Sequence, residues 1–439
     1  MPMSSIVSPR RTDTAPLTAA FTASGVATAV AALVLTIVIV SFRPFQPAGA
    51  GAVEGGDIVN QLGFGSVGAF AIFALATMAN PARLRAIAGL PWFVLLCFFL
   101  ISVGEAADPA GAFRAASFTI IGILAMATVL ALPRDGDSFS TVLVFAGFVV
   151  VGLSYAGVIL YPSVAIHGAD GFEPEHAGLW RGAFSHKNIA APVMACFSFA
   201  GIYLIRRHWR WSGYILLVMS MFFMIHTGSK TTAGLVPLSI MLVLLPGTVG
   251  MRLGTPMLFA MAVIGTALAT LGIVFIEPLK LLATHHFPEL TYTGRTTVWT
   301  FAGEMIAKKP WFGYGYESFW RTPLVTGIGH AYDQGWDIRF IVHGHNGYID
   351  IAVTMGLPAL AVAVYVFLIA PLRDYMRIPL YKENVFLGDF FMMVVLFTAL
   401  NAFLESFFFR RIDPVWMFFV FGVLGLRMVS RMVIHKSTG

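Results

Sequence analysis

The feature that most constrains this chain is a series of apolar blocks long enough to cross a lipid bilayer. A transmembrane helix needs about 20 consecutive, mostly apolar residues. Lipid offers no hydrogen-bond partners, so the backbone of each block must pair within itself as a helix. The sequence therefore predicts an all-α, polytopic integral membrane protein with about twelve transmembrane helices, at residues 24–42, 60–79, 86–104, 115–132, 139–160, 188–205, 212–226, 231–246, 255–276, 346–370, 387–408 and 413–429.

Composition and charge placement agree with this class and suggest an orientation. The chain is 58% hydrophobic and 11% charged, which is far more apolar than a soluble protein. Lys and Arg concentrate in the short connections on the side of the N-terminus, and the opposite connections hold few of them. By the positive-inside rule, both termini are expected in the cytoplasm, with the long loops 161–187 and 277–345 outside. The net charge of +6 follows from this bias and needs no nucleic-acid partner.

The long loops divide the chain into three parts. We expect nine helices and loop 161–187 in residues 1–276, an external loop domain in 277–345, and three more helices in 346–430. The first block has a second interpretation as a cleaved signal peptide, because Arg10 and Arg11 precede it and Ala48-Gly-Ala50 follows it.

The external loop contains a predicted amphipathic helix near residues 295–309. Its apolar residues recur at helical spacing, at Val298, Phe301, Ala302, Met305 and Ile306. We expect this helix to lie against the membrane interface, with Trp299 and Trp311 at headgroup depth. Arg295 at its N-terminus would add a guanidinium to the helix dipole, and both favour an anion. The alternative is that Arg295 pairs with a nearby carboxylate or lipid headgroup.

A polar cluster, His343-Gly-His-Asn-Gly-Tyr-Ile-Asp350, closes the external loop where the tenth apolar block begins. The imidazole of histidine can accept a proton from a hydroxyl near neutral pH. Asn346 and Asp350 are four residues apart on one helix face, so either side chain can support His343 and His345. Two alternatives stay open: a histidine pair satisfied by backbone carbonyls, and a metal site completed by His330 or Asp333. No third ligand stands at a diagnostic spacing, so we expect no metal and no cofactor.

Cationic residues gather at the outer helix junctions, where they can neutralise a diphosphate together. They are Arg181, Lys187, Lys230 and Arg295, with His186 and Asn188 beside Lys187. Singly, each of these cations is typical of an interfacial side chain. The acidic alternatives for a catalytic role are weaker. Asp135-Gly-Asp137 is expected to be a solvated turn, and Glu54 and Asp57 have no histidine nearby in the sequence.

These motifs together resemble the O-antigen ligase and polymerase superfamily of bacterial envelope polysaccharide enzymes. His345-Asn346, nine residues and then Gly356 resembles the ligase signature, although Ala359 stands where the signature has Gly, Thr or Tyr. Thr293-Gly-Arg295 and Gly182-Ala-Phe-Ser-His-Lys-Asn188 also resemble family motifs, whereas Lys230 stands where relatives show Ser-Arg. The residues around His186-Lys-Asn188 and Gly228-Ser-Lys230 most resemble exopolysaccharide polymerases of the succinoglycan type.

The resemblance implies transfer of a glycan from undecaprenyl diphosphate to a sugar hydroxyl at the periplasmic face of the bacterial inner membrane. It implies an inverting, metal-independent polymerase of repeat units, or alternatively a ligase that attaches lipid-linked glycan to lipid A-core or another acceptor. Arg295, then Lys230 and Lys187, would hold the diphosphate, and His345 would deprotonate or orient the acceptor hydroxyl. The other expected substrate-binding residues are Arg181, His186, Asn188, His343 and Asn346. Expected partners are the lipid-linked glycan, membrane lipid, a chain-length regulator and other polysaccharide-assembly proteins.

The strongest interpretation from another class is a lipid-linked oligosaccharide flippase. Such a transporter is expected to place several charged residues in mid-helix, lining a cavity. The apolar blocks are nearly free of ionisable groups, and Glu405, near the outer end of one block, is a single candidate. This disfavours transport. A scaffold subunit of the polysaccharide machinery is a third possibility that the sequence leaves open.

Overall fold

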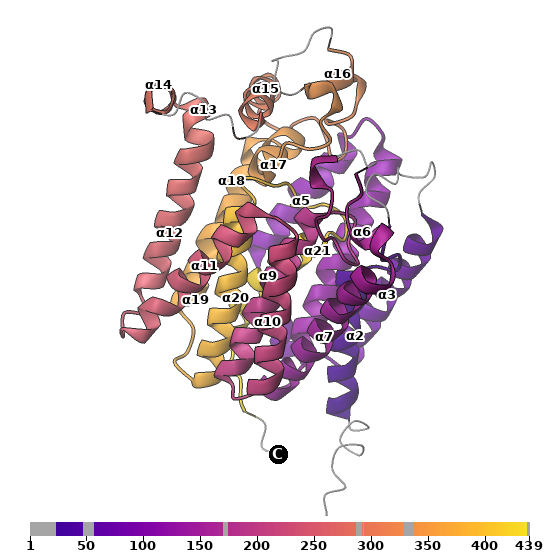
Figure 1. The fold of residues 1–439 in the computed structure, drawn as a ribbon, viewed down its shortest axis with the longest axis vertical. Helices are drawn as coiled ribbons and strands as arrows, with labels where there is room; N and C mark the ends of the chain where they lie inside the picture. Colours follow the sequence, from indigo (N-terminus) through magenta and orange to yellow (C-terminus); the bar gives the residue numbers. More distant parts are fainter. Residues whose placement is uncertain are drawn as a thin grey trace, which may run out of the picture.

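The computed structural model describes residues 23–46, 57–169, 174–286, 292, 294–328 and 337–436. These residues form a bundle of helices, and no β-strand occurs among them (Figure 1). An isolated bridge between Ile166 and Trp180 is the extent of β-type pairing in the described part. The prediction of an all-α, polytopic membrane protein is confirmed.

The N-terminal helices form one side of the bundle, in indigo and purple in Figure 1. In chain order they are α2 (Ala23–Val40), α3 (Ile58–Thr77), α4 (Pro81–Ile87), α5 (Leu90–Gly104), α6 (Pro109–Ala131), α7 (Gly136–Leu160) and the short α8 (Pro162–Ala165). Several of these helices begin at an acidic or amide side chain that accepts a hydrogen bond from the first turn, as N-caps do: Asp57, Asn80, Asp108 and Asp135.

The remaining helices alternate between long spans and short external pieces. The middle of the chain holds η1 (Pro174–His176), α9 (Lys187–Arg206), α10 (Arg210–His226), α11 (Lys230–Thr248), α12 (Gly254–Ala267), η2 (Leu268–Gly272) and α13 (Ile273–Phe275). The rest holds α14 (Glu277–His286), α15 (Arg295–Lys308), α16 (Pro323–Thr326), η3 (Ile338–Phe340), α17 (Gly347–Met355), α18 (Leu357–Val364), η4 (Tyr365–Ile369), α19 (Ala370–Met376), α20 (Lys382–Asn401) and α21 (Pro414–Val429).

The described residues contain eight helices that are long and apolar enough to cross a membrane. These are α3, α6, α7, α9, α11, the run Gly254–Phe275, the run Leu357–Met376 and α20. The pair α4 and α5, bent by 66°, makes a ninth if it is counted as one span, and α2 and α21 are shorter apolar helices. Each of the twelve apolar blocks contains a helix, but the count of twelve spans is not confirmed.

The centre of the bundle is formed by α9, α20 and α21. Most residues of these helices are buried on every side, whereas α3, α11 and the run Gly254–Phe275 expose most of their surface. A helix that is apolar all round and buried packs among other helices, and one that is apolar and exposed faces lipid. The central helices therefore form a rigid support, and their ends position the segments described below.

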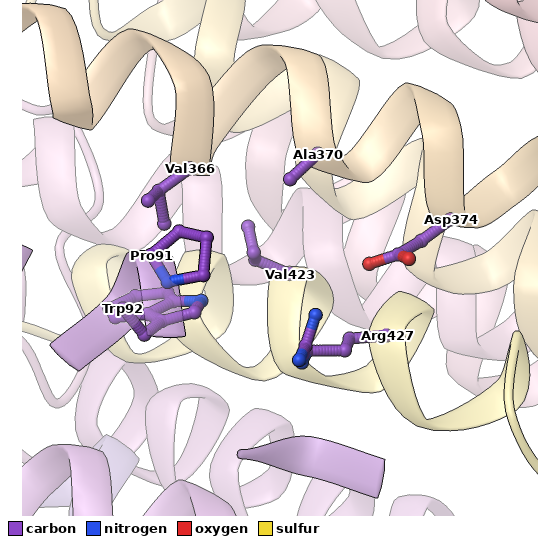
Figure 2. Close-up of a pocket in the computed structure, with 7 residues that line it drawn as sticks. All are labelled: Pro91, Trp92, Val366, Ala370, Asp374, Val423 and Arg427. Atoms are coloured by element: carbon purple, nitrogen blue, oxygen red, sulfur yellow. The ribbon is translucent and has the colours of Figure 1, made fainter. Parts of the chain in front are cut away.

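The block 86–104 is broken rather than continuous, and an arginine compensates for the break. The residues between α4 and α5 leave backbone carbonyls without helical partners. The Nε of Arg427, on α21, donates to the carbonyls of Ile87 and Ala88, at 3.0 Å each. Figure 2 shows this guanidinium beside Trp92 and Asp374 in a small pocket between α5, α19 and α21. A charged side chain thus satisfies backbone carbonyls at the bend between α4 and α5.

The tenth block, 346–370, is also broken, at Gly356. Gly356 ends α17 with φ +87 and ψ 170, a conformation that side chains rarely adopt. The segment Trp311–Tyr316 packs against this break, because Tyr314 N donates to the carbonyl of Val353 and Leu357 N donates to that of Pro310. This segment, which contains Gly313 and Gly315, therefore packs back onto the bundle. The correction is that α17 is a separate nine-residue helix rather than the start of a span.

The helix expected at the membrane interface packs against protein. The apolar side of α15 forms a small core with α16, η3 and α17, which includes Val298, Phe301 and Phe319. Trp299 is fully buried, and its indole N–H donates to the carbonyl of Gly344 at 2.9 Å. The prediction that Trp299 lies at headgroup depth is therefore wrong, whereas Trp311 is exposed. Figure 1 shows α14, α15, α16 and α17 together at one end of the bundle, which we call the loop end.

The opposite end, where the chain's C-terminus lies in Figure 1, is rich in ion pairs. Arg207 pairs with Glu383 at 2.6 Å and with Asp137 at 2.9 Å, and Arg206 pairs with Asp389 at 2.8 Å. The expectation of a merely solvated turn at Asp135-Gly-Asp137 is thus incomplete, because Asp135 caps α7 and Asp137 contacts a buried arginine. These pairs satisfy cations that the sequence assigns to the cytoplasmic side.

The break at Gly356 gives a prediction about stability. Gly356→Ala adds a Cβ against the backbone carbonyl of Trp311 in a conformation reserved for glycine, so it should lower the free energy of unfolding by about 2–3 kcal/mol. The measurement is thermal unfolding of the detergent-solubilised protein. Gly265→Ala is the matched control, because it lies in α12 with open space around it, and it should raise the stability slightly. Equal melting temperatures for the two variants would contradict the prediction.

Candidate functional site

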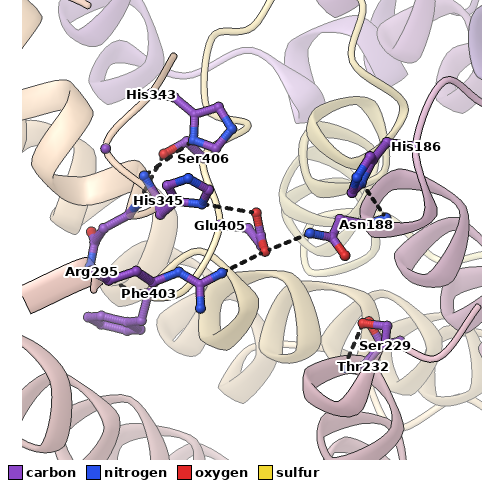
Figure 3. A network of polar contacts seen from close by, with 12 residues as sticks. His186, Asn188, Ser229, Thr232, Arg295, His343, His345, Phe403, Glu405 and Ser406 are labelled. Carbon is purple, nitrogen blue, oxygen red and sulfur yellow. Dashed lines mark hydrogen bonds and ion pairs between the residues drawn. The ribbon is translucent and has the colours of Figure 1, made fainter. Parts of the chain in front are cut away.

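Three polar side chains from distant parts of the sequence meet around the carboxylate of Glu405 at the loop end (Figure 3). Its Oε1 lies 3.2 Å from Nη2 of Arg295 and accepts a hydrogen bond from Nδ2 of Asn188 at 3.1 Å. Its Oε2 lies 3.9 Å from Nδ1 of His345. The structure therefore brings together Arg295, Asn188 and His345, all of which were candidates from sequence.

Each member of this group is positioned by the end of a helix. Arg295 is the first residue of α15, and Asn188 lies in the first turn of α9. Glu405 lies in the turn that follows α20, and His345 immediately precedes the N-cap of α17. About one-fifth of the Arg295, Glu405 and His345 side chains is exposed (19%, 20% and 18%). The group is therefore largely shielded from solvent, but part of each of these three side chains remains accessible.

The backbone beside His345 is clamped to the turn that carries Glu405. Gly347 N donates to the carbonyls of Ala402 at 2.8 Å and Glu405 at 3.2 Å. Asn346 N donates to Oγ of Ser406 at 3.0 Å, and Asn346 Nδ2 donates to the carbonyl of Phe403 at 3.0 Å. These hydrogen bonds fix the histidine and the carboxylate in one rigid unit.

His345 itself has a left-handed backbone, with φ +47. This conformation is unfavourable for a residue with a side chain and persists where the surroundings enforce it. The preceding Gly344 is held from both sides: its N–H donates to Oδ1 of Asp350 at 3.0 Å, and its carbonyl accepts from Trp299. Asp350 also accepts from the indole of Trp320 at 2.8 Å. Asp350 therefore supports the histidine segment, as the sequence suggested for this residue or Asn346.

His343 lies against His345, with ring centroids 4.2 Å apart. Burial lowers the pKa of His343 well below its usual value, and the neighbouring His345, Arg410 and Arg295 lower it further. His343 is therefore neutral at neutral pH, and its Nδ1 accepts the backbone N–H of His345 at 3.3 Å. It can act as a neutral hydrogen-bonding group, but it does not add a positive charge to the site.

His186 and Lys187 form the start of α9 on the other side of Glu405. Nδ1 of His186 accepts from Asn188 N at 3.1 Å, which caps the helix that carries Asn188. The backbone N–H of Lys187 donates to Nε2 of His167 at 3.2 Å. Figure 3 shows Ser229 and Thr232, at the start of α11, on the Asn188 side of the site. Lys230, the first residue of α11, is exposed there.

Two of the candidate substrate-binding residues are engaged inside the protein. Arg181 is buried, and its Nη1 donates to the carbonyls of Gln46 at 2.5 Å and Ser185 at 3.0 Å. Asn346 is fully buried, and its Oδ1 accepts from Tyr348 N and Ile349 N at the start of α17. Both side chains are thus held by contacts within the protein, and the substrate contact that the sequence suggested for them stays a prediction.

The alternatives for a catalytic or metal site do not gather here. Asp57 caps α3 and pairs with Arg43 at 3.1 Å, while Glu54 lies outside the described residues. His330 and Asp333 also lie outside them. In the described part of the chain, no three His, Cys, Asp or Glu side chains are placed to hold a metal ion.

Glu405 is the member of this group that sequence reasoning did not assign to the candidate site. It attracted notice only as a single acidic residue near the end of an apolar block. Its partners lie 217 and 110 residues away along the chain, so no local pattern links them. The available signal was the cost of placing an unpaired carboxylate near the bilayer, which predicts that a cationic or polar partner exists.

Comparison with known proteins gives a family match for the middle of the chain. Residues 184–364 match the family model described as O-Antigen ligase, and this match supports the resemblance to the O-antigen ligase and polymerase superfamily. Among curated proteins, none matches the chain. The matched residues contain His186, Asn188, Arg295 and His345, whereas Glu405 lies beyond them.

The role of Asn346 gives a second prediction. Asn346→Ala removes the N-cap of α17 and the hydrogen bond to the Phe403 carbonyl, so it should lower the free energy of unfolding by about 2 kcal/mol. Thermal unfolding in detergent measures this loss. The control is Asn80→Ala at the start of α4, where the cap is exposed and the loss should be smaller. A stable Asn346→Ala protein that fails only to bind a lipid-linked glycan would show instead that Asn346 contacts substrate.

Proposed function

We propose that this protein belongs to the O-antigen ligase and polymerase superfamily and polymerises oligosaccharide repeat units carried on undecaprenyl diphosphate. The reaction is glycan transfer from the lipid diphosphate to a sugar hydroxyl of another chain. We place it at the loop end, facing the periplasm from the inner membrane. The family match supports a membrane glycan ligase or polymerase in general, and the particular reaction is our proposal.

The observation that carries the proposal is the pairing of Arg295 with His345 across Glu405. Nε of Arg295 is buried and has no hydrogen-bond partner among the described residues. A buried donor of this kind is costly unless a ligand or water satisfies it. Arginine forms bidentate hydrogen bonds with phosphate oxygens, so a diphosphate could accept a hydrogen bond from this Nε.

The chemistry requires a cationic group and a proton acceptor at adjacent positions. Displacement of the lipid diphosphate places developing negative charge on its leaving oxygen, and Arg295 would stabilise that charge. His345, held beside it, would take the proton of the attacking hydroxyl. Direct attack by this hydroxyl on the anomeric carbon inverts its configuration. The bond to the diphosphate already stores the free energy of transfer, so the proposal includes no nucleotide and no metal.

The remaining candidates are assigned by where they lie. Lys187 and Lys230 are the first residues of α9 and α11 at the loop end. They would contact the phosphate of the diphosphate that lies further from Arg295, on the side of the lipid. His186, Asn188 and the neutral His343 would hydrogen-bond sugar hydroxyls or phosphate oxygens. Membrane lipid, a chain-length regulator and other polysaccharide-assembly proteins complete the proposed set of partners.

A ligase reaction is the second candidate, and the matched family description favours it. The residues around His186 and Lys230 most resemble those of succinoglycan-type polymerases, and this resemblance favours polymerisation. The two reactions leave different lipid-linked intermediates in a strain without this protein. Single repeat units on the periplasmic side indicate a polymerase, and long lipid-linked chains without transfer indicate a ligase. Single units retained on the cytoplasmic side would mean that the protein is a flippase.

The assigned roles give a third prediction, tested with purified protein in liposomes containing a lipid-linked glycan. Arg295→Lys loses the planar fork that binds two phosphate oxygens and should lower the rate of transfer about 100-fold. His345→Ala should lower it at least as much, because no other imidazole holds the same place.

The control for this assay is Arg411→Lys. Arg411 is exposed at the loop end and pairs with Glu317, so the variant should transfer glycan at the wild-type rate. Well-folded Arg295→Lys and His345→Ala proteins with wild-type rates would remove both residues from the mechanism.

A further inference from the structure

We infer that Glu405 is a positioning residue that orients the imidazole of His345. When the donor binds, the Arg295 guanidinium leaves the Glu405 carboxylate and binds the diphosphate. This inference rests on the proposed function. It concerns a residue that lies outside the segment matching the family model. The geometry of its carboxylate, the anchoring of its backbone and the charges around it carry the argument.

The two oxygens of Glu405 face different partners. Oε1 accepts from Nδ2 of Asn188 and lies in ion-pair contact with Nη2 of Arg295, whereas Oε2 faces Nδ1 of His345 (Figure 3). Asn188 holds the carboxylate independently of the cation. If a diphosphate draws Arg295 away, Asn188 therefore still keeps Glu405 in place beside the imidazole. A carboxylate with Arg295 as its sole anchor would lose its position at that moment.

The backbone of Glu405 cannot move away from His345. The Glu405 carbonyl accepts from Gly347 N, and its own N–H donates to the carbonyl of Asn401 at the end of α20. On both sides of it, Phe403 and Ser406 hold Asn346. The left-handed backbone of His345 is enforced within this unit. Such local strain is typical of residues whose orientation matters for function.

The contact between Oε2 and Nδ1 selects one form of the imidazole. A carboxylate facing Nδ1 favours the tautomer with the proton on Nδ1, which leaves the Nε2 lone pair available as a base. At 3.9 Å the two atoms are at ion-pair distance, longer than a hydrogen bond. The negative charge therefore stabilises the imidazolium once it forms.

The step balances without a further reactant. A lone pair of the acceptor hydroxyl forms the new bond to the anomeric carbon, and the bond from that carbon to the diphosphate oxygen breaks. The bonding electrons leave with the lipid diphosphate, which Arg295 holds. The hydroxyl proton passes to Nε2 of His345. The resulting imidazolium lies beside Glu405 until it releases the proton to solvent.

A simpler role for Glu405 is to neutralise Arg295 in the resting protein. The two roles predict different kinetics. If Glu405 only supports Arg295, its loss weakens donor binding and raises KM. If it acts through His345, its loss lowers kcat. Donor binding is then retained or tightened, because the carboxylate no longer competes with the diphosphate for the guanidinium.

The experiment uses the full chain in liposomes with a lipid-linked glycan as donor, and it compares Glu405→Gln, Glu405→Asp and His345→Ala. Glu405→Gln should lower kcat about 100-fold, with KM for the donor unchanged or lower. Glu405→Asp, which keeps the charge further from His345, should retain an intermediate kcat. The Glu405→Gln/His345→Ala double variant should be no slower than His345→Ala alone, because the two residues act as a unit.

The matched control is Glu317→Gln, an acid-to-amide change in an exposed ion pair at the loop end, and it should leave kcat and KM at wild-type values. A raised KM with unchanged kcat in Glu405→Gln, or losses that multiply in the double variant, would overturn the inference while leaving the proposed function standing. Failure of the wild-type protein to transfer any glycan would overturn both. If Glu405→Gln does not fold, Glu405→Asp decides through its kcat and KM.

Discussion

The hydrogen-bonded clamp between the turn Ala402–Ser406 and the segment His345–Gly347 holds the loop end of this protein together. It joins the end of α20, one of the largely buried central helices, to the start of α17. The external core around α15 packs on α17 and so brings Arg295 next to the Glu405 carboxylate. Because α20 is rigid, the position of the whole group follows from a few backbone hydrogen bonds.

Buried charge is shared among several groups at both ends of the bundle. At the opposite end, Asp389 is shared by Arg206, Arg252 and Tyr375, and both Nη atoms of Arg252 are buried without a hydrogen-bond partner among the described residues. At the loop end, Glu405 is shared among Arg295, Asn188 and His345, and Arg295 keeps an unsatisfied buried donor. What distinguishes the loop end is that a histidine lies in the same group, so a cation and a proton acceptor are adjacent there.

The class of the fold follows from hydrophobicity, and several site residues follow from local motifs. Arg295 and His345 stand at junctions between apolar blocks and polar loops, where ionisable side chains have few structural reasons to occur. The breaks at Gly89 and Gly356 were missed because hydrophobicity continues through both, although a proline follows two residues after each glycine. The place of Trp299 was mispredicted, since an apolar helix face does not reveal whether lipid or protein covers it. Glu405 was missed because its contacts are all distant in sequence.

The most direct test of the account is an experimental structure of the protein with a non-cleavable phosphonate analogue of a lipid-linked sugar diphosphate. The account predicts that the diphosphonate lies against the Arg295 guanidinium, and that Glu405 keeps its contact with Asn188. It also predicts that the anomeric carbon lies on the Nε2 side of His345. A diphosphonate bound at another end of the bundle, or with Arg295 still paired to Glu405, would contradict the account.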